Sequence, residues 1–98
     1  MNYDAKVNED GRLIILKELV LQVDGRMNEV SLMRVLDAFA IRRSREWVRT
    51  QLLKMAELGA IDVSEAGTVM IAHVTKLGRN HVAEREVIVG ITRPGDDN

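Results

Sequence analysis

The chain of 98 residues contains no cysteine, one proline and only three aromatic residues. The absence of cysteine excludes disulfides, thiolate metal sites and cysteine nucleophiles. Because aromatic side chains are so few, the core must be built from leucine, isoleucine, valine and methionine. Apolar runs such as Leu13 to Leu16 are far shorter than a membrane span, and no signal peptide is evident. We therefore expect a cytoplasmic, single-domain protein.

Basic and acidic residues nearly balance, but they are unevenly placed along the chain. The net charge is −1, which is not the strongly basic balance of an architectural nucleic-acid binder. Both ends of the chain are acidic, whereas residues 42–54 contain one acidic residue, Glu46, and five basic ones: Arg42, Arg43, Arg45, Arg49 and Lys54. This basic island indicates a local surface for an anionic partner, which the net charge of the whole chain does not reveal.

The pattern of apolar residues predicts a domain over residues 11–86, with a flexible polar start at 1–10 and an extension at 87–98. Asp10 is the expected N-cap of a first helix from Gly11 to Val23. This helix is apolar nearly all round. Either the other helices of the same chain cover it, or a second copy does. We expect a homodimer through the first and fourth helices, aided by the apolar residues 87–91.

Two further helices precede a hairpin. Asn28 is expected to cap a helix over residues 29–40, whose apolar stripe places Phe39 in the core. Ser44 is expected to cap a third helix that runs to about Leu58 and ends at Gly59. Its buried stripe comprises Val48, Leu52 and Met55.

Residues 60–74 alternate apolar and polar side chains, and a helical pattern follows them. Residues 60–64 and 68–74 read as two strands joined by a turn at Glu65-Ala66-Gly67. Thr75 is expected to cap a fourth helix over residues 76–85. Gly78 inside it costs helix propensity, which indicates a close packing contact there. The expected order is α-α-α-β-β-α, mostly α with a small antiparallel hairpin.

Two motifs resemble those of known regulators. The third helix leaves through KMAELGAI, and the second strand enters the last helix through VTKLGRNHV. These are similar to the corresponding segments of MarR, PadR and ArsR-like proteins. The layout resembles the small winged helix-turn-helix proteins of Mu-like phages and prophages, over roughly residues 10–86.

The resemblance implies a dimeric double-stranded-DNA-binding protein that regulates transcription in the cytoplasm of a bacterial host cell. The third helix would enter the major groove, with its groove-facing set at Ser44, Arg45, Glu46, Arg49 and Thr50. Arg42 and Arg43 would lie near phosphates. Two departures are visible. The expected wing tip, residues 65–68, has no lysine or arginine, and the cysteine ligands of metal-sensing ArsR proteins are missing.

The residues themselves allow more than one reading of this helix. Arg45 and Arg49 are four residues apart and share a face, from which they could contact guanine or phosphate. Glu46 could accept from cytosine or pair with a neighbouring arginine. The alternative is a solvated basic face without a ligand. Trp47 is expected either to pack against the second helix or hairpin, or to anchor a protein partner.

A protein-interaction adaptor for phage assembly or packaging is therefore the competing function, because fold does not settle function. His73 and His81 are the only nitrogen ligands available to a metal, and each is expected to be either structural or solvated. No catalytic constellation stands out. We expect no enzyme, no cofactor and no metal site.

Overall fold

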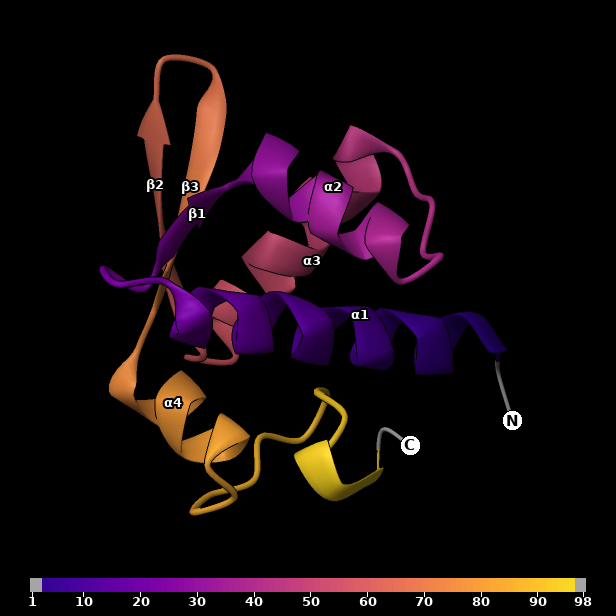
Figure 1. The fold of residues 1–98 in the computed structure, drawn as a ribbon, viewed down its shortest axis with the longest axis vertical. Helices are drawn as coiled ribbons and strands as arrows, with labels where there is room; N and C mark the ends of the chain where they lie inside the picture. Colours follow the sequence, from indigo (N-terminus) through magenta and orange to yellow (C-terminus); the bar gives the residue numbers. More distant parts are fainter. Residues whose placement is uncertain (1–2, 97–98) are drawn as a thin grey trace.

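The computed structural model describes residues 3–96, which form four α-helices and a three-stranded antiparallel sheet (Figure 1). The elements in order are α1 (Tyr3–Leu21), β1 (Arg26–Asn28), α2 (Glu29–Ala38), α3 (Arg45–Glu57), β2 (Ile61–Ala66), β3 (Val69–Val74), α4 (Lys76–Val82) and a short 3-10 turn (Pro94–Asp96). The fold is therefore mixed α/β, not the mostly helical chain with a lone hairpin that we expected. The expected fold lacked β1, because a strand of three residues is too short to show a two-residue period in the sequence.

The sheet has the order β1-β3-β2, with β3 in the centre. Ala72 of β3 pairs with Met27 of β1 on one side and with Val63 of β2 on the other. The buried residues of β3 are Met70, Ala72 and Val74, and they face the helices. Beyond the end of β1, β2 and β3 continue as a two-stranded hairpin (Figure 1). The third strand gives this hairpin the support that two strands alone would lack.

Helix α1 begins earlier than expected and lies at the centre of the fold. It starts at Tyr3, so Asp10 lies inside the helix and is not its N-cap. Residues 3–10 are helical, and residues 1–2 of the expected flexible start lie outside the described part of the chain. Leu13, Leu16 and Leu19 are buried. Contacts with α2, α3, α4 and β3 cover most of the apolar surface of this helix, whereas Leu21 at its end stays exposed.

Three of the four expected N-caps are confirmed. Asn28 accepts a hydrogen bond from the Ser31 N–H at 2.9 Å, and Ser44 Oγ accepts one from the Trp47 N–H at 3.1 Å. Thr75 Oγ1 accepts from the Gly78 N–H at 3.1 Å. Gly59 follows α3 with φ 84°, the left-handed conformation expected after a helix end.

The prediction that Phe39 belongs to the core is wrong. Its side chain is 59% exposed. Helix α2 ends at Ala38, and Ala40 adopts φ 64° in the turn that follows. The helical period that placed Phe39 beside Leu32 and Leu36 therefore stops before it reaches Phe39.

Helix α4 is shorter than expected, and the chain after it packs back onto α1 (Figure 1). Within this segment Ile88 and Ile91 are buried, whereas Val87 and Val89 are exposed. Arg12 Nη1 donates to the Gly90 carbonyl at 2.6 Å and holds the segment against α1. Residues 87–92 thus complete the core without forming a strand.

Candidate nucleic-acid interface

The N-terminal half of α3 displays most of the residues that the sequence assigned to DNA contact. Ser44 ends the connection from α2 and caps the helix. Six of the seven predicted residues are exposed, and Arg49 is partly buried; the exposed ones are Arg42, Arg43, Ser44, Arg45, Glu46 and Thr50. Thr50 Oγ1 donates to the Glu46 carbonyl one turn earlier, at 3.0 Å, so this hydroxyl is already engaged.

Two of the arginines converge on a carboxylate that the sequence did not single out. Arg45 Nε lies 2.7 Å from Glu29 Oε1, and Arg49 Nη1 lies 3.4 Å from Glu29 Oε2. Glu29 is the first residue of α2 and is fully buried. Its second oxygen also accepts a hydrogen bond from the Met70 N–H of β3. The group therefore joins α2, α3 and the hairpin.

Glu29 is held in its charged form. Burial by itself would raise the pKa of Glu29, but the hydrogen bonds from Arg45 and from the Met70 N–H, with the charges of Arg45 and Arg49, outweigh it and lower that pKa. The pKa of Arg45 is raised by the hydrogen bond and charge of Glu29. The N-terminus of α2 also favours an anionic side chain at this position.

The hairpin tip is part of the same network. The Thr68 carbonyl, just before β3, accepts from Arg45 Nη2 at 3.5 Å and from Arg49 Nη1 at 3.4 Å. Residues 64–68 are exposed. Thus the guanidinium groups lie between α3 and the hairpin, where they link the two. No cationic side chain from residues 64–68 joins them, because the sequence contains none there.

Trp47 contacts α1, an element that was not among those expected for it. Its Nε1 donates to Asn8 Oδ1 at 3.0 Å, and its ring lies against Gly11, where a Cβ would be only 2.9 Å from Cη2. Arg43 stacks over the indole, with its guanidinium carbon 5.9 Å from the ring centroid. An open groove of about 360 Å³ is lined by Asp4, Asn8, Arg43 and Trp47.

The arginines thus differ in what holds them. Arg45 and Arg49 are anchored to Glu29, Arg43 rests on Trp47, and Arg42 is exposed. Sequence reasoning missed Glu29 because an acidic residue in the first turn of a helix is common. Its partners lie 16 and 20 residues away, and no local pattern connects them.

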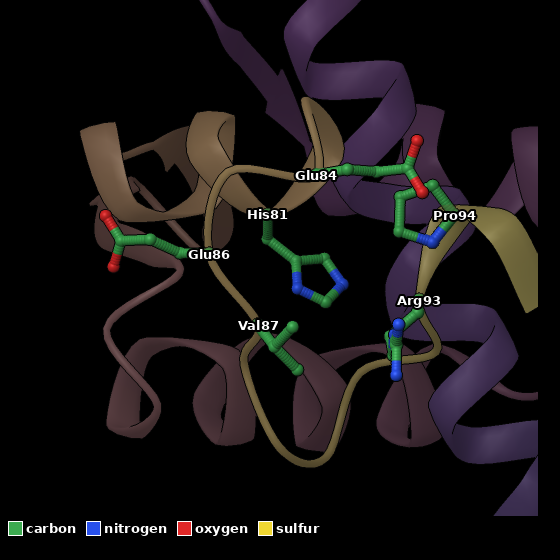
Figure 2. A pocket seen from close by; sticks show the side chains of 6 residues that line it. All are labelled: His81, Glu84, Glu86, Val87, Arg93 and Pro94. Atoms are coloured by element: carbon green, nitrogen blue, oxygen red, sulfur yellow. The ribbon is translucent and has the colours of Figure 1, made fainter.

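His81 is buried, which makes it structural and not solvated. Figure 2 shows His81 of α4 directed toward the C-terminal segment beside a cavity of about 50 Å³. Its Nδ1 accepts from the Ile88 N–H at 3.0 Å, so Nε2 carries the proton that is donated to the Thr92 carbonyl at 2.9 Å. Among residues 3–96, no group of three or more histidine, aspartate or glutamate side chains is placed to hold a metal ion.

Within the described residues, no helix is both long and apolar enough to cross a membrane. No family model matches the chain, and no solved structure matches it. The resemblance to ArsR- and MarR-like groups therefore stays a prediction.

One curated relative covers nearly the whole chain. It is gp26 of Escherichia phage Mu, described as an uncharacterized protein, and it is 31% identical over 88 residues. The match spans 90% of this chain and 91% of the relative. Similarity at this level over almost the full length indicates common descent. The chain belongs to the family of phage Mu gp26 and is of Mu-like phage origin.

Proposed function

We propose that this protein is a winged helix-turn-helix protein that binds double-stranded DNA through the N-terminal half of α3, as a phage transcriptional regulator. The order α1-β1-α2-α3-β2-β3 supports the fold, with α3 as the second helix of the helix-turn-helix and β2–β3 as the wing. The resemblance in the two sequence motifs points the same way.

The observation that carries the proposal is the arrangement of arginines at the start of α3. Arg42 and Arg43 are exposed, and Arg45 and Arg49 are directed toward the hairpin by Glu29 and Thr68. A recognition helix contacts DNA mainly through its N-terminal residues, and arginine serves both phosphates and guanine there. Against Glu29 and Glu46, the four arginines still leave this surface with a formal charge of +2.

The test must avoid the arginines that are part of the fold. Replacing Arg45 and Arg49 together would leave Glu29 buried without its cations. The informative variant is Arg42→Gln/Arg43→Gln, because both side chains are exposed. The matched control is Lys76→Gln/Arg85→Gln, which removes the same charge from exposed positions in and after α4.

Binding to a fluorescently labelled mixed-sequence duplex is measured by anisotropy across a salt series. The wild-type protein and the α4 control should lose affinity steeply with salt. Arg42→Gln/Arg43→Gln should bind more weakly and reduce the slope of log K against log salt by roughly 2, since each phosphate contact contributes about 0.9. Equal weakening by the control, or no binding by the wild type at low salt, would refute the proposal.

A protein-interaction adaptor is the second candidate, and the groove beside Trp47 favours it. This groove places a partly buried indole between an acidic residue, Asp4, and a basic residue, Arg43. The tip of the hairpin carries Glu65 and no cation. An adaptor would show no salt-dependent association with duplex DNA, so the same titration separates the two functions.

The homodimer remains a prediction, and less apolar surface is exposed for it than the sequence indicated. The core-facing residues of α1 are covered by the protein's own α2, α3, α4 and β3. Four exposed apolar residues remain of the predicted surface: Leu21 and Val23 at and just after the end of α1, and Val87 and Val89 of the C-terminal segment. Sedimentation equilibrium of the wild type and of Val87→Ser/Val89→Ser tests it: a dimer that the double variant abolishes would support this surface.

A further inference from the structure

Glu29 constrains how Arg45 is presented at the surface. Glu29 itself is fixed by three elements: it lies at the start of α2, accepts from the Met70 N–H of β3, and pairs with two residues of α3. Its side chain is fully buried, whereas that of Arg45 is 42% exposed. One end of the ion pair is therefore immobile and the other end reaches solvent.

The contacts of Arg45 leave one edge of its guanidinium for a ligand. A guanidinium has five N–H donors in one plane. Within residues 3–96, Arg45 donates from Nε to Glu29 and from Nη2 to the Thr68 carbonyl. Both N–H groups of Nη1 and one of Nη2 stay available. These N–H groups lie at the outer end of the guanidinium. The bond from Nε to Glu29 fixes the plane in which they lie.

We infer that Glu29 is a positioning residue that orients Arg45 to read a guanine in the major groove through its O6 and N7 acceptors. This inference rests on the proposed binding of DNA by α3. Bidentate pairing with guanine needs a planar fork at a defined angle, which a mobile surface arginine would have to adopt at an entropic cost. Anchoring by Glu29 removes much of that cost before binding.

The same contact reduces non-specific attraction. The charge of Glu29 offsets one of the two arginines that it touches, so fewer positive charges act on phosphates. A carboxylate that only stabilised the fold would have no effect on base preference. Glu29 is therefore expected to raise discrimination between bases while lowering the affinity for duplex DNA in general.

The experiment uses two duplexes of about 20 base pairs, or two helical turns. One has an alternating dG–dC sequence, and in the other every guanine is replaced by 7-deazaguanine, which lacks the N7 acceptor. The proteins are the wild type, Glu29→Gln and Arg45→Lys. The control is Asp37→Asn, which makes the same charge change at an exposed position of α2.

The wild type and Asp37→Asn should bind the guanine duplex at least about fivefold more tightly than the 7-deazaguanine duplex. Glu29→Gln should bind both duplexes with affinities equal within about twofold, and more tightly than the wild type binds the 7-deazaguanine duplex. Arg45→Lys should also lose the preference, because lysine keeps the charge but has no planar fork.

Each result bears on a different statement. A folded Glu29→Gln that keeps the wild-type preference would overturn the positioning role. If this variant does not fold, retention of the preference by Arg45→Lys overturns it. A wild type that binds both duplexes equally well refutes the guanine contact but leaves DNA binding by α3 standing. A wild type that binds neither duplex at low salt refutes the proposed function itself.

Discussion

Replacing Gly78 with alanine tests the close approach of α4 to the residue before β2. A Cβ at position 78 would lie 2.3 Å from the Ala60 carbonyl oxygen, and 3.0 Å from side-chain atoms of Leu16 and Val74. The carbonyl cannot move freely, because it accepts from the Thr75 N–H at 3.1 Å and shares the Thr75 hydroxyl, at 3.0 Å, with the nearer Gly59 carbonyl at 2.7 Å. Helix α4 must therefore move instead.

The magnitude follows from two opposing effects. Ordinary contact begins near 3.4 Å, so α4 has to shift by about 1 Å. Overpacking of this kind costs about 3 kcal/mol at the upper end of its usual range. Alanine also favours the helix by about 1 kcal/mol over glycine. The free energy of unfolding should therefore fall by about 2 kcal/mol, which lowers Tm by roughly 8–16 °C in a domain of this size.

Thermal unfolding followed by circular dichroism measures the effect, with Gly11→Ala as the matched control. Gly11 also lies in a helix, and its Cβ would meet Trp47 at 2.9 Å. That neighbour is a side chain beside an open groove and not backbone, and a shift of about 0.5 Å is enough, so the gain in helix propensity offsets most of the cost and Tm should change by less than about 5 °C. A Gly78→Ala protein as stable as the wild type would refute the reasoning.

Three further predictions concern buried polar groups and the exposed end of α2. Because the folded-state pKa of Glu29 lies below its ordinary value of 4.5, its ion pairs stabilise the fold above that pH, and this contribution is lost as the pH falls below it. Glu29→Gln should therefore flatten the pH dependence of urea midpoints between about pH 7 and pH 3; an unchanged slope would contradict the assignment. His81→Phe should cost about 1–3 kcal/mol and speed amide exchange at Ile88, whose N–H loses its acceptor; protection equal to the wild type would argue against this contact. Phe39→Ser should change stability by less than about 0.5 kcal/mol, whereas Leu36→Ala should cost about 2–5 kcal/mol, and equal costs would place Phe39 back in the core.

The boundaries that could be predicted depend on interactions within a few residues. Asn28, Ser44 and Thr75 each bond to an N–H three residues ahead, and each begins a helix where the sequence placed one. Gly59 ends α3 for an equally local reason, its left-handed φ. The capping rule gave the wrong helix start at Asp10. Asp10 has the chemistry of an N-cap, but the helix continues through it because Leu13 and Leu16 bury one face and nothing stops the turns before them.

The order of the helices and the hairpin, the aliphatic core and the place of the arginines on α3 follow from patterns along the chain. Helical period and capping are local, so these features needed no knowledge of distant contacts. The contacts of those arginines depend on how the elements pack. Glu29 meets Arg45, Arg49 and the Met70 N–H across 16 to 41 residues, and Trp47 meets Asn8 across 39. A buried carboxylate must be paired with cations, and the packing of α2, α3 and β3 determines which ones lie near it. For that reason two arginines of the basic island, Arg45 and Arg49, are anchored to Glu29.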